Sequence, residues 1–202
     1  REMAYVLGFF SADGYITINR RGGQFWCIQI RDKVLLQNIR RAIQSGHRIS
    51  VRTKKGNNSK MYRIQIGSIE MCEDLRVLGL IPNKTNRLRV PKVPEQFFED
   101  YLRGYFDGDG NVWSGLLNRQ RLRSTKVIFV AFTSASVPFL KDMHFQLQKM
   151  GICGGTISKV KDCNCGRLSF STLDTLKLYK IMYNVPHKLY LPRKKLVFER
   201  FI

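Results

Sequence analysis

Two short stretches of this chain follow one pattern and end in the same two residues. Val6-Leu-Gly-Phe-Phe-Ser-Ala-Asp-Gly14 and Leu102-Arg-Gly-Tyr-Phe-Asp-Gly-Asp-Gly110 both run apolar, any, Gly, apolar, apolar, any, small, Asp, Gly. Their acids, Asp13 and Asp109, lie 96 positions apart (109 − 13) in a chain of 202 residues. The pattern therefore indicates two copies of one unit, and we expect the function where the two copies meet.

Each stretch is predicted to be a buried helix that stops at Asp-Gly. Small residues recur four positions apart, and such a stripe lets two helix backbones approach closely. Gly14 and Gly110 suit the left-handed backbone position just past a helix end. The predicted helix interface comprises Ala4, Gly8, Gly104 and Gly108.

The acids are in an unfavourable place for a carboxylate. The last turn of a helix is the negative end of its dipole, yet the chain puts Asp13 and Asp109 there. If the small faces pair, the two like charges come close together, and divalent cations would relieve the repulsion. The last helix carbonyls, those of Ala12 and Gly108, would be further oxygen ligands. The alternative is a solvated acid in each turn.

These stretches resemble the LAGLIDADG motif of homing endonucleases, in the single-chain form that carries two motifs. The second stretch is close to the consensus, whereas the first has Ser11 where the second has Asp107. The resemblance implies an α+β (mixed α/β) fold of two pseudo-symmetric αββαββα units, each with a saddle-shaped antiparallel sheet, packed through the motif helices. In the family the penultimate acid of the motif binds metal, and Asp13 and Asp109 hold that position here.

Two lysines are candidates for a further catalytic role. Pro82-Asn-Lys84 and Pro186-His-Lys188 stand 104 positions apart, after the last helix predicted in each unit. The resemblance implies a basic residue beside the active site at this place. Lys84 and Lys188 are therefore predicted to polarise the phosphate or orient water. The alternative is a lysine that contacts phosphate or solvent.

The repeat also predicts the domains. Residues 1–89 form the first unit, 90–96 a proline-bounded linker and 97–202 the second unit. In the first unit, alternating residues predict hairpins at 15–31 and 48–67, and apolar faces predict helices at 33–45 and 69–78. The second unit repeats this plan with hairpins at 111–133 and 156–171 and helices at 137–150 and 173–183. It carries eight extra residues (104 − 96) in its first hairpin.

The charge indicates a polyanionic partner. The chain has 35 Lys and Arg against 15 Asp and Glu, a net charge of +20, which favours DNA or RNA. The basic residues are spread over the chain, so no membrane role is predicted. Outward strand positions carry side chains that contact base edges and phosphates, although polar outer faces are common on antiparallel sheets. The predicted DNA contacts are Thr17, Asn19, Gln24, Gln29, Arg31, Arg48, Ser50, Arg52, Lys54, Arg63, Gln65, Arg119, Arg121, Arg123, Thr133, Ser158, Lys159, Lys161, Arg167 and Ser169.

The five cysteines are odd in number, which suggests free thiols and a reducing, intracellular compartment, either a bacterial or archaeal cytoplasm or an organelle. Cys163-Asn-Cys165 near Cys153 is interpreted as a hairpin tip rather than a zinc site, because its spacing is not that of a zinc finger. No transmembrane segment is predicted. Because Arg1 lies beside the first motif, we expect a chain trimmed from a longer protein.

Together with these features, the resemblance implies a monomeric, Mg²⁺-dependent, site-specific endonuclease that cuts both strands of double-stranded DNA at a long, non-palindromic site. Ca²⁺ is expected to support binding without cleavage. The gene would be free-standing or belong to an intron or intein. Two alternatives remain open: an RNA maturase that assists splicing of its own intron RNA, and a sequence-specific DNA-binding protein that no longer cleaves.

Overall fold

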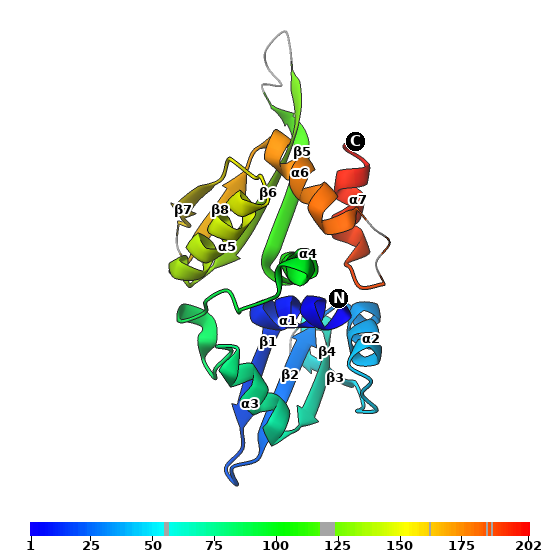
Figure 1. The fold of residues 1–202 in the computed structure, drawn as a ribbon. Helices are drawn as coiled ribbons and strands as arrows, with labels where there is room; N and C mark the ends of the chain where they lie inside the picture. Colours follow the sequence, from blue (N-terminus) through cyan, green and yellow to red (C-terminus); the bar gives the residue numbers. More distant parts are fainter. Residues whose placement is uncertain (55–56, 118–123, 162, 185, 187) are drawn as a thin grey trace. The chain divides into compact units, whose positions relative to one another are not determined.

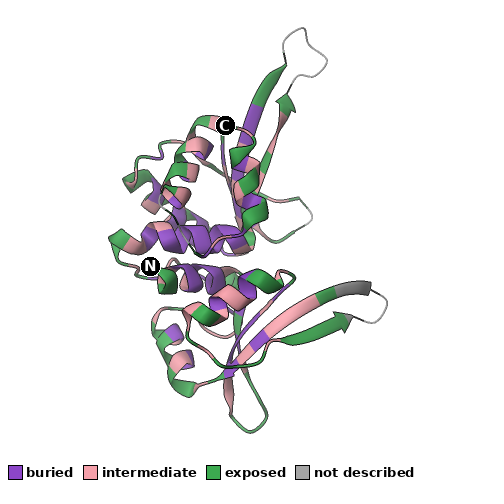
Figure 2. Ribbon diagram, turned by 90° about the vertical axis from the view of Figure 1, so that its right-hand side faces the viewer, coloured by how far each residue is buried: buried purple, intermediate pink, exposed green. Residues whose placement is uncertain are grey.

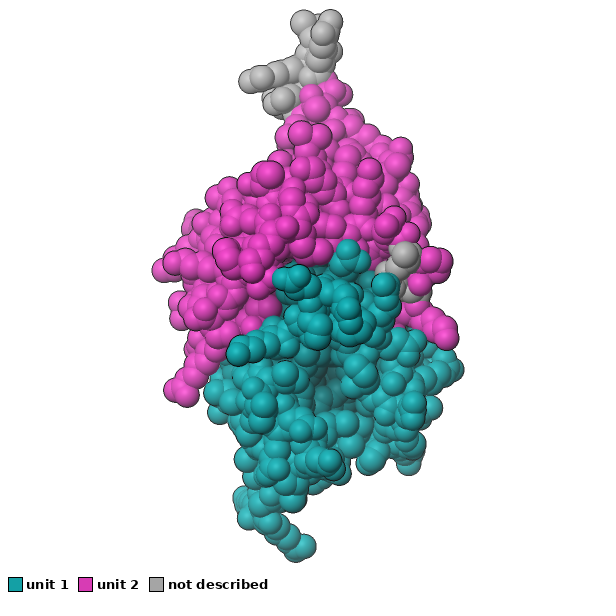
Figure 3. Space-filling view, viewed as in Figure 1, with its two compact units in different colours: residues 1–84, 91–108 teal, residues 85–90, 109–202 magenta. Residues whose placement is uncertain are grey.

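The computed structural model describes residues 1–54, 57–117, 124–161, 163–184, 186 and 188–202. These residues form two four-stranded antiparallel sheets with helices packed against them (Figure 1). Two compact units divide the chain (Figure 3). The first comprises residues 1–84 and 91–108, and the second comprises 85–90 and 109–202. No described helix has the length and hydropathy that crossing a bilayer requires.

The first unit has the sheet order β1-β2-β4-β3. Helices α1, α2 and α3 pack on this sheet, and Trp26, Ile28 and Ile64 are buried beneath them. The unit also contains the first eleven residues of α4. Its elements are α1 (Glu2–Asp13), β1 (Gly14–Ile18), β2 (Gln24–Ile30), α2 (Lys33–Ala42), β3 (Ser50–Lys54), β4 (Asn57–Gly67), α3 (Ile69–Val77), the 3₁₀ turn η2 (Glu95–Phe97) and α4 (Phe98–Asp109). The 3₁₀ turn η1 (Lys84–Asn86) begins at Lys84 and continues into the second unit.

The second unit repeats this plan with the sheet order β5-β6-β8-β7. Its elements are β5 (Gly110–Leu117), β6 (Thr125–Ser134), α5 (Val137–Lys149), β7 (Thr156–Lys159), β8 (Gly166–Phe170), α6 (Thr172–Tyr183) and α7 (Pro192–Glu199). The predicted α+β fold of two units is confirmed, and β5 and β6 are longer than β1 and β2, where the extra residues were expected. Helix α7 was not predicted.

Local signals in the sequence explain where several helices begin. Asp32 precedes α2, and its carboxylate accepts a hydrogen bond from the Leu35 amide at 2.8 Å. The Ser68 hydroxyl accepts from Met71 at the start of α3, at 3.1 Å. Such caps satisfy an amide that has no partner within the helix, and each stabilises its helix by about 1 kcal/mol.

Helices α1 and α4 approach each other through their glycines. A methyl group on Gly8 would lie 2.0 Å from the Tyr101 carbonyl oxygen, and one on Gly104 would lie 2.0 Å from that of Tyr5. Most of α4 is buried as a result (Figure 2). Gly14 differs from the predicted left-handed cap, because its backbone is extended (φ −84°). A side chain there would collide with the Phe10 ring, which explains the glycine.

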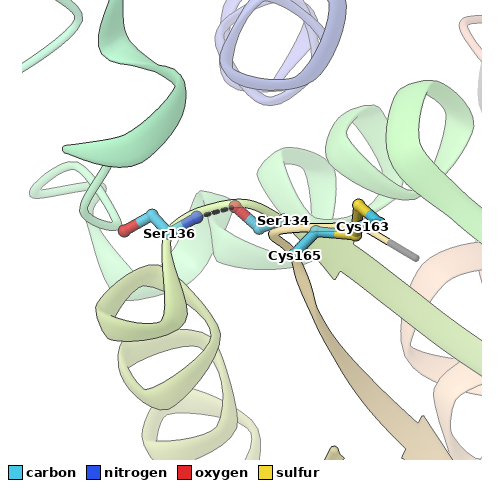
Figure 4. The surroundings of a disulfide bond; sticks show 4 residues. All are labelled: Ser134, Ser136, Cys163 and Cys165. Carbon is cyan, nitrogen blue, oxygen red and sulfur yellow. Dashed lines mark hydrogen bonds between the residues drawn. A yellow bond between two sulfur atoms is a disulfide. The ribbon is translucent and has the colours of Figure 1, made fainter. Parts of the chain in front are cut away.

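The cysteines depart in part from the sequence prediction. Cys163 and Cys165 form a disulfide between β7 and β8 (Figure 4), so the expectation of free thiols is wrong for these two. The Val160 amide donates to the Cys165 carbonyl at 2.9 Å, as at the end of a hairpin. Cys27, Cys72 and Cys153 are free. Among the described residues, no cluster of three or more His, Cys, Asp or Glu could hold a metal ion.

Candidate active site and nucleic-acid interface

Each motif helix ends in an exposed acid. The glycine that follows the acid accepts a hydrogen bond from a lysine through its backbone carbonyl. Asp13 ends α1, and the Lys84 ammonium donates to the Gly14 carbonyl oxygen at 2.6 Å. Asp109 ends α4, and the Lys194 ammonium donates to the Gly110 carbonyl oxygen, also at 2.6 Å. Both lysines are buried, with 8% and 6% of their surface exposed. The two units therefore repeat one arrangement of acid, glycine and buried lysine.

The second lysine of this arrangement is Lys194 rather than the predicted Lys188. Lys188 is exposed and lies five positions after the end of α6, whereas Lys194 lies in α7. Ile81-Pro-Asn-Lys84 corresponds to Leu191-Pro-Arg-Lys194 at an offset of 110, so the second unit carries six further residues (110 − 104) before this element. One signal favoured this register. Leu88 lies four residues after Lys84, and the matching position after Lys194 is apolar Phe198, whereas after Lys188 it is a proline.

Two tyrosines link the motif helices. The Tyr5 hydroxyl donates to the Asp107 carboxylate at 2.6 Å, and the Tyr101 hydroxyl donates to the Ser11 hydroxyl at 3.2 Å. Tyr5 and Tyr101 are 96 positions apart, as are Ser11 and Asp107, so these contacts are equivalent in the repeat. All four side chains are buried. The residue at which the first motif departs from the consensus therefore contributes to helix packing. Sequence reasoning did not find the tyrosines.

The other residues of the predicted helix interface take different positions. A methyl group on Gly108 would lie 2.4 Å from the Ala12 side chain, so these helix ends are also close. Ala4, by contrast, is half-buried and lines a cavity of the first unit. Gly8, Gly104 and Gly108 are the positions of closest approach.

The outer face of the first sheet carries most of the predicted contacts in that unit. In the pairing of the strands, Gln29 lies opposite Arg63, and Arg63 opposite Ser50. Thr17, Arg52 and Gln65 lie on the same face, because paired residues share a face and successive residues alternate. None of these residues is buried, whereas Ile28 and Ile64 on the opposite face are.

Arg63 is held in place at the centre of this outer face. Its guanidinium lies 5.8 Å from the centre of the Tyr15 ring and donates to the Cys27 sulfur at 3.5 Å. Burial raises the pKa of the Tyr15 hydroxyl, the Cys27 thiol adds to the rise and the Arg63 charge opposes it. The arginine therefore lies over an aromatic ring, which reduces the freedom it would lose on binding.

Other residues of the predicted set lie elsewhere. Gln24 lies on the helix-covered face, where its side chain accepts a hydrogen bond from Arg76 of α3, so it departs from the predicted outer face. The Asn19 side chain accepts hydrogen bonds from the backbone amides of Arg21 and Gly23, at 2.9 and 2.8 Å. Asn19 thereby stabilises the β1–β2 turn. Arg31 and Arg48 are exposed outside the strands. The Lys54 side chain lies outside the described residues.

The second sheet presents a comparable outer face. Thr133 lies opposite Arg167, and Arg167 opposite Ser158, with Ser169 two positions along β8. Lys159 and Lys161 are exposed beside the disulfide-closed hairpin. Arg119, Arg121 and Arg123 lie outside the described residues. As far as the strands are described, β1 to β8 contain no Asp or Glu, so neither sheet presents a carboxylate to an approaching phosphate.

Solved structures of LAGLIDADG meganucleases share this fold. The crystal structure of the LAGLIDADG meganuclease I-AabMI bound to uncleaved DNA superposes with a TM-score of 0.64 at 14% identity, over 98% of this chain and 87% of that chain. The I-SmaMI LAGLIDADG homing endonuclease bound to cleaved DNA gives 0.64 at 14%, over 97% and 86%. Mesophilic variants of the homing endonuclease I-DmoI give 0.61 at 12%, over 92% and 96%.

The sequence agrees with the fold. Residues 1–77 match the family model described as a LAGLIDADG-like domain. The resemblance to the LAGLIDADG family predicted from the two motifs is thus confirmed. A curated relative is the probable translation initiation factor IF-2 of Thermococcus kodakarensis (strain ATCC BAA-918 / JCM 12380 / KOD1), 30% identical over 150 residues. The match covers 69% of this chain and 12% of that relative, so the chain spans a small part of the relative's length.

Proposed function

We propose that this chain is a site-specific endonuclease that hydrolyses one phosphodiester in each strand of a long, non-palindromic DNA target. The observation that carries the proposal is the arrangement of acid, glycine and buried lysine, which occurs once in each unit, at Asp13 with Lys84 and at Asp109 with Lys194. Two equivalent arrangements match a reaction that must be carried out twice. Two of the proteins of similar fold named above, I-AabMI and I-SmaMI, were solved bound to uncleaved and to cleaved DNA.

The donor atoms at the two helix ends suit a hard divalent cation such as Mg²⁺. Asp13 and Asp109 are exposed carboxylates, and the carbonyl oxygens of Ala12 and Gly108 belong to last turns, where intrahelical donors run out. Such all-oxygen sets are what Mg²⁺ and Ca²⁺ prefer. When bound, the metal would lower the pKa of a water molecule and stabilise charge on the phosphate. One solved structure of similar fold is I-SmaMI on an uncleaved target in the presence of calcium ions.

The lysines and the sheets have separate tasks in this proposal. Lys84 and Lys194 are fixed by their glycine carbonyls, so an ammonium charge is already in place beside each acid where negative charge develops on the phosphate. On the sheets, Arg63, Gln65 and Arg167 are suited to base edges in a major groove. The surrounding cations neutralise phosphates, so binding should weaken steeply as salt rises.

The curated relative bears on where such a nuclease is encoded. Its name is that of a translation factor, and this chain matches a stretch that is 12% of it. We infer that the endonuclease is carried inside a longer polypeptide, as in an intein, rather than encoded alone.

The test begins with a library of duplexes, because the target must first be found. Sequences cleaved in the presence of Mg²⁺ are selected and cloned into a supercoiled plasmid. The wild-type chain should linearise it. Asp13→Asn and Asp109→Asn should each abolish double-strand cleavage yet retain binding in Ca²⁺, whereas Glu73→Gln, an exposed acid of α3, should cut normally. No cleaved sequence at any salt or metal concentration, or full activity of the two Asn variants, would contradict the proposal.

A further inference from the structure

The first unit contains a half-open cavity of about 600 Å³ that the proposed nuclease function does not use. It lies among α1, α3, the start of β2 and residues 92–97. Its volume is in the range of protein binding pockets. Its lining contains neither a motif acid nor any residue assigned above to the outer face of the sheet. The apolar lining includes Met3, Leu7, Phe10, Trp26, Leu75 and Leu78.

The charge at this cavity is opposite to that of the chain. Among the described residues, two carboxylates, Glu70 and Asp74, and one cation, Lys92, line the cavity, whereas the whole chain has 35 basic and 15 acidic residues. Glu70 and Asp74 are four residues apart on α3, so they share one side of that helix, and both are exposed. An apolar cavity with two carboxylates does not suit DNA. It suits an apolar group that carries positive charge.

The second unit shows how the matching helix is covered. Helix α6 follows the last strand of its sheet, as α3 does, and its Tyr179 stacks on Phe198 of α7 at 5.1 Å. Helix α7 also carries three consecutive basic residues, Arg193 to Lys195. After α3 the same Pro-x-Lys element leads into the short 3₁₀ turn η1. Between α3 and α4, the described residues therefore form no helix equivalent to α7.

We propose that this cavity is a docking site for a short amphipathic helix of a partner polypeptide, with an apolar stripe and flanking Lys or Arg. Two or three apolar side chains spaced i, i+3 or i+4 and i+7 would enter the cavity. The basic flanks would pair with Glu70 and Asp74. The sites for DNA and for the helix involve different faces of the first unit, since the cavity is lined from the helix side of the sheet.

Two labelled synthetic helices of about 18 residues, five helical turns, provide the probe. They share one Leu and Phe stripe and differ only in their flanks, which are Lys in one and Glu in the other. Fluorescence anisotropy measures their binding to the wild-type chain in the presence of excess DNA duplex, which occupies the basic faces. If the chain bound peptides by its net charge of +20 alone, it would bind the Glu-flanked helix more tightly than the Lys-flanked one.

The proposal predicts that the Lys-flanked helix binds at least about tenfold tighter than the Glu-flanked one. The double variant Glu70→Gln/Asp74→Asn should weaken it about fivefold or more. Glu73→Gln should leave it unchanged, because Glu73 is exposed on the same helix but does not line the cavity. Unchanged thermal unfolding and DNA binding of the double variant would confirm that it is folded.

Three results would overturn the proposal: no binding of the Lys-flanked helix, equal or tighter binding of the acidic helix, or an affinity that the double variant leaves unchanged. Sedimentation of the chain alone tests the other occupant, a second copy. Self-association that the double variant abolishes, without peptide binding, would assign the cavity to a copy of this chain and refute a separate partner.

Discussion

The contact between α1 and α4 makes a sharp prediction about Gly8 and Gly104. A methyl group at Gly8 would lie 2.0 Å from the Tyr101 carbonyl oxygen and 2.9 Å from the Tyr105 amide nitrogen. At Gly104 it would lie 2.0 Å from the Tyr5 carbonyl oxygen. These neighbours are helix backbone, which cannot rotate away as a side chain can. Gly8→Ala and Gly104→Ala should therefore each force the two helices apart.

The size of the effect follows from the distances. Bringing the new methyl group from 2.0 Å to 3.0 Å requires a separation of roughly 1 Å. A gap of that size forfeits a quarter to a half of the dispersion energy of the contacts it opens, and the rings around it are fully buried. We put the steric cost at about 3–4 kcal/mol, above the common range for overpacking. Alanine returns about 1 kcal/mol of helix propensity, which leaves a net loss of about 2–3 kcal/mol.

Urea unfolding followed by far-ultraviolet circular dichroism measures this loss as a lower midpoint at constant slope. Gly46→Ala is the matched control, because a methyl group there meets nothing within 4 Å and the backbone φ is not positive. The control should stay within about 0.5 kcal/mol of the wild type. If the two helix variants unfold at the wild-type midpoint, the close approach of α1 and α4 is refuted.

Three further predictions concern single side chains. Lys194→Met should slow DNA cleavage about a hundredfold, because it removes an ammonium fixed beside Asp109, whereas Lys188→Met should cut normally; equal loss in both would refute the assignment of Lys194. Tyr5→Phe should lower the urea stability by about 1.5–3 kcal/mol, because it removes a buried hydrogen bond to a carboxylate; an unchanged midpoint would show that this bond is not formed. In the native chain iodoacetamide should label exposed Cys153 before Cys72, since burial raises the pKa of the Cys72 thiol and the thiolate is the reactive form; peptide mapping that finds equal rates would argue against the burial of Cys72.

The sequence predicted the elements wherever a local pattern was sufficient. Residues 24–30 and 61–67 alternate, and Asp32 and Ser68 mark helix starts, so neighbouring residues alone locate β2, β4, α2 and α3. The outer face was predicted for the same reason. Gln24 shows the limit of that reasoning, because it lies five residues from Gln29 and a regular strand cannot present both on one face.

Features that depend on distant residues were missed. A fixed offset of 104 matched Lys84 to Lys188, because Pro-x-Lys occurs twice near the end of the chain and the six added residues shift the true equivalent to Lys194. The contact with the Gly110 carbonyl distinguishes the two lysines. The bond from Tyr5 to Asp107 joins residues 102 positions apart and left no local signal. The Cys163–Cys165 disulfide was missed because two cysteines that close together suggested a plain turn.

The reciprocal tyrosine contacts have a consequence for how this chain could be divided. Tyr5 of α1 contacts Asp107 of α4, and Tyr101 of α4 contacts Ser11 of α1. The two helices therefore pair with the reciprocal contacts of a two-fold homodimer interface, although both belong to one polypeptide. A fragment that ends at the 90–96 linker would leave the buried face of α1 open. Two such fragments could pair α1 with α1, but each Tyr5 would then meet Ser11 instead of a carboxylate. A homodimer of such fragments would thus keep the helix pairing but lack the hydrogen bond from tyrosine to a carboxylate. Ser11→Asp is the substitution that would restore that bond.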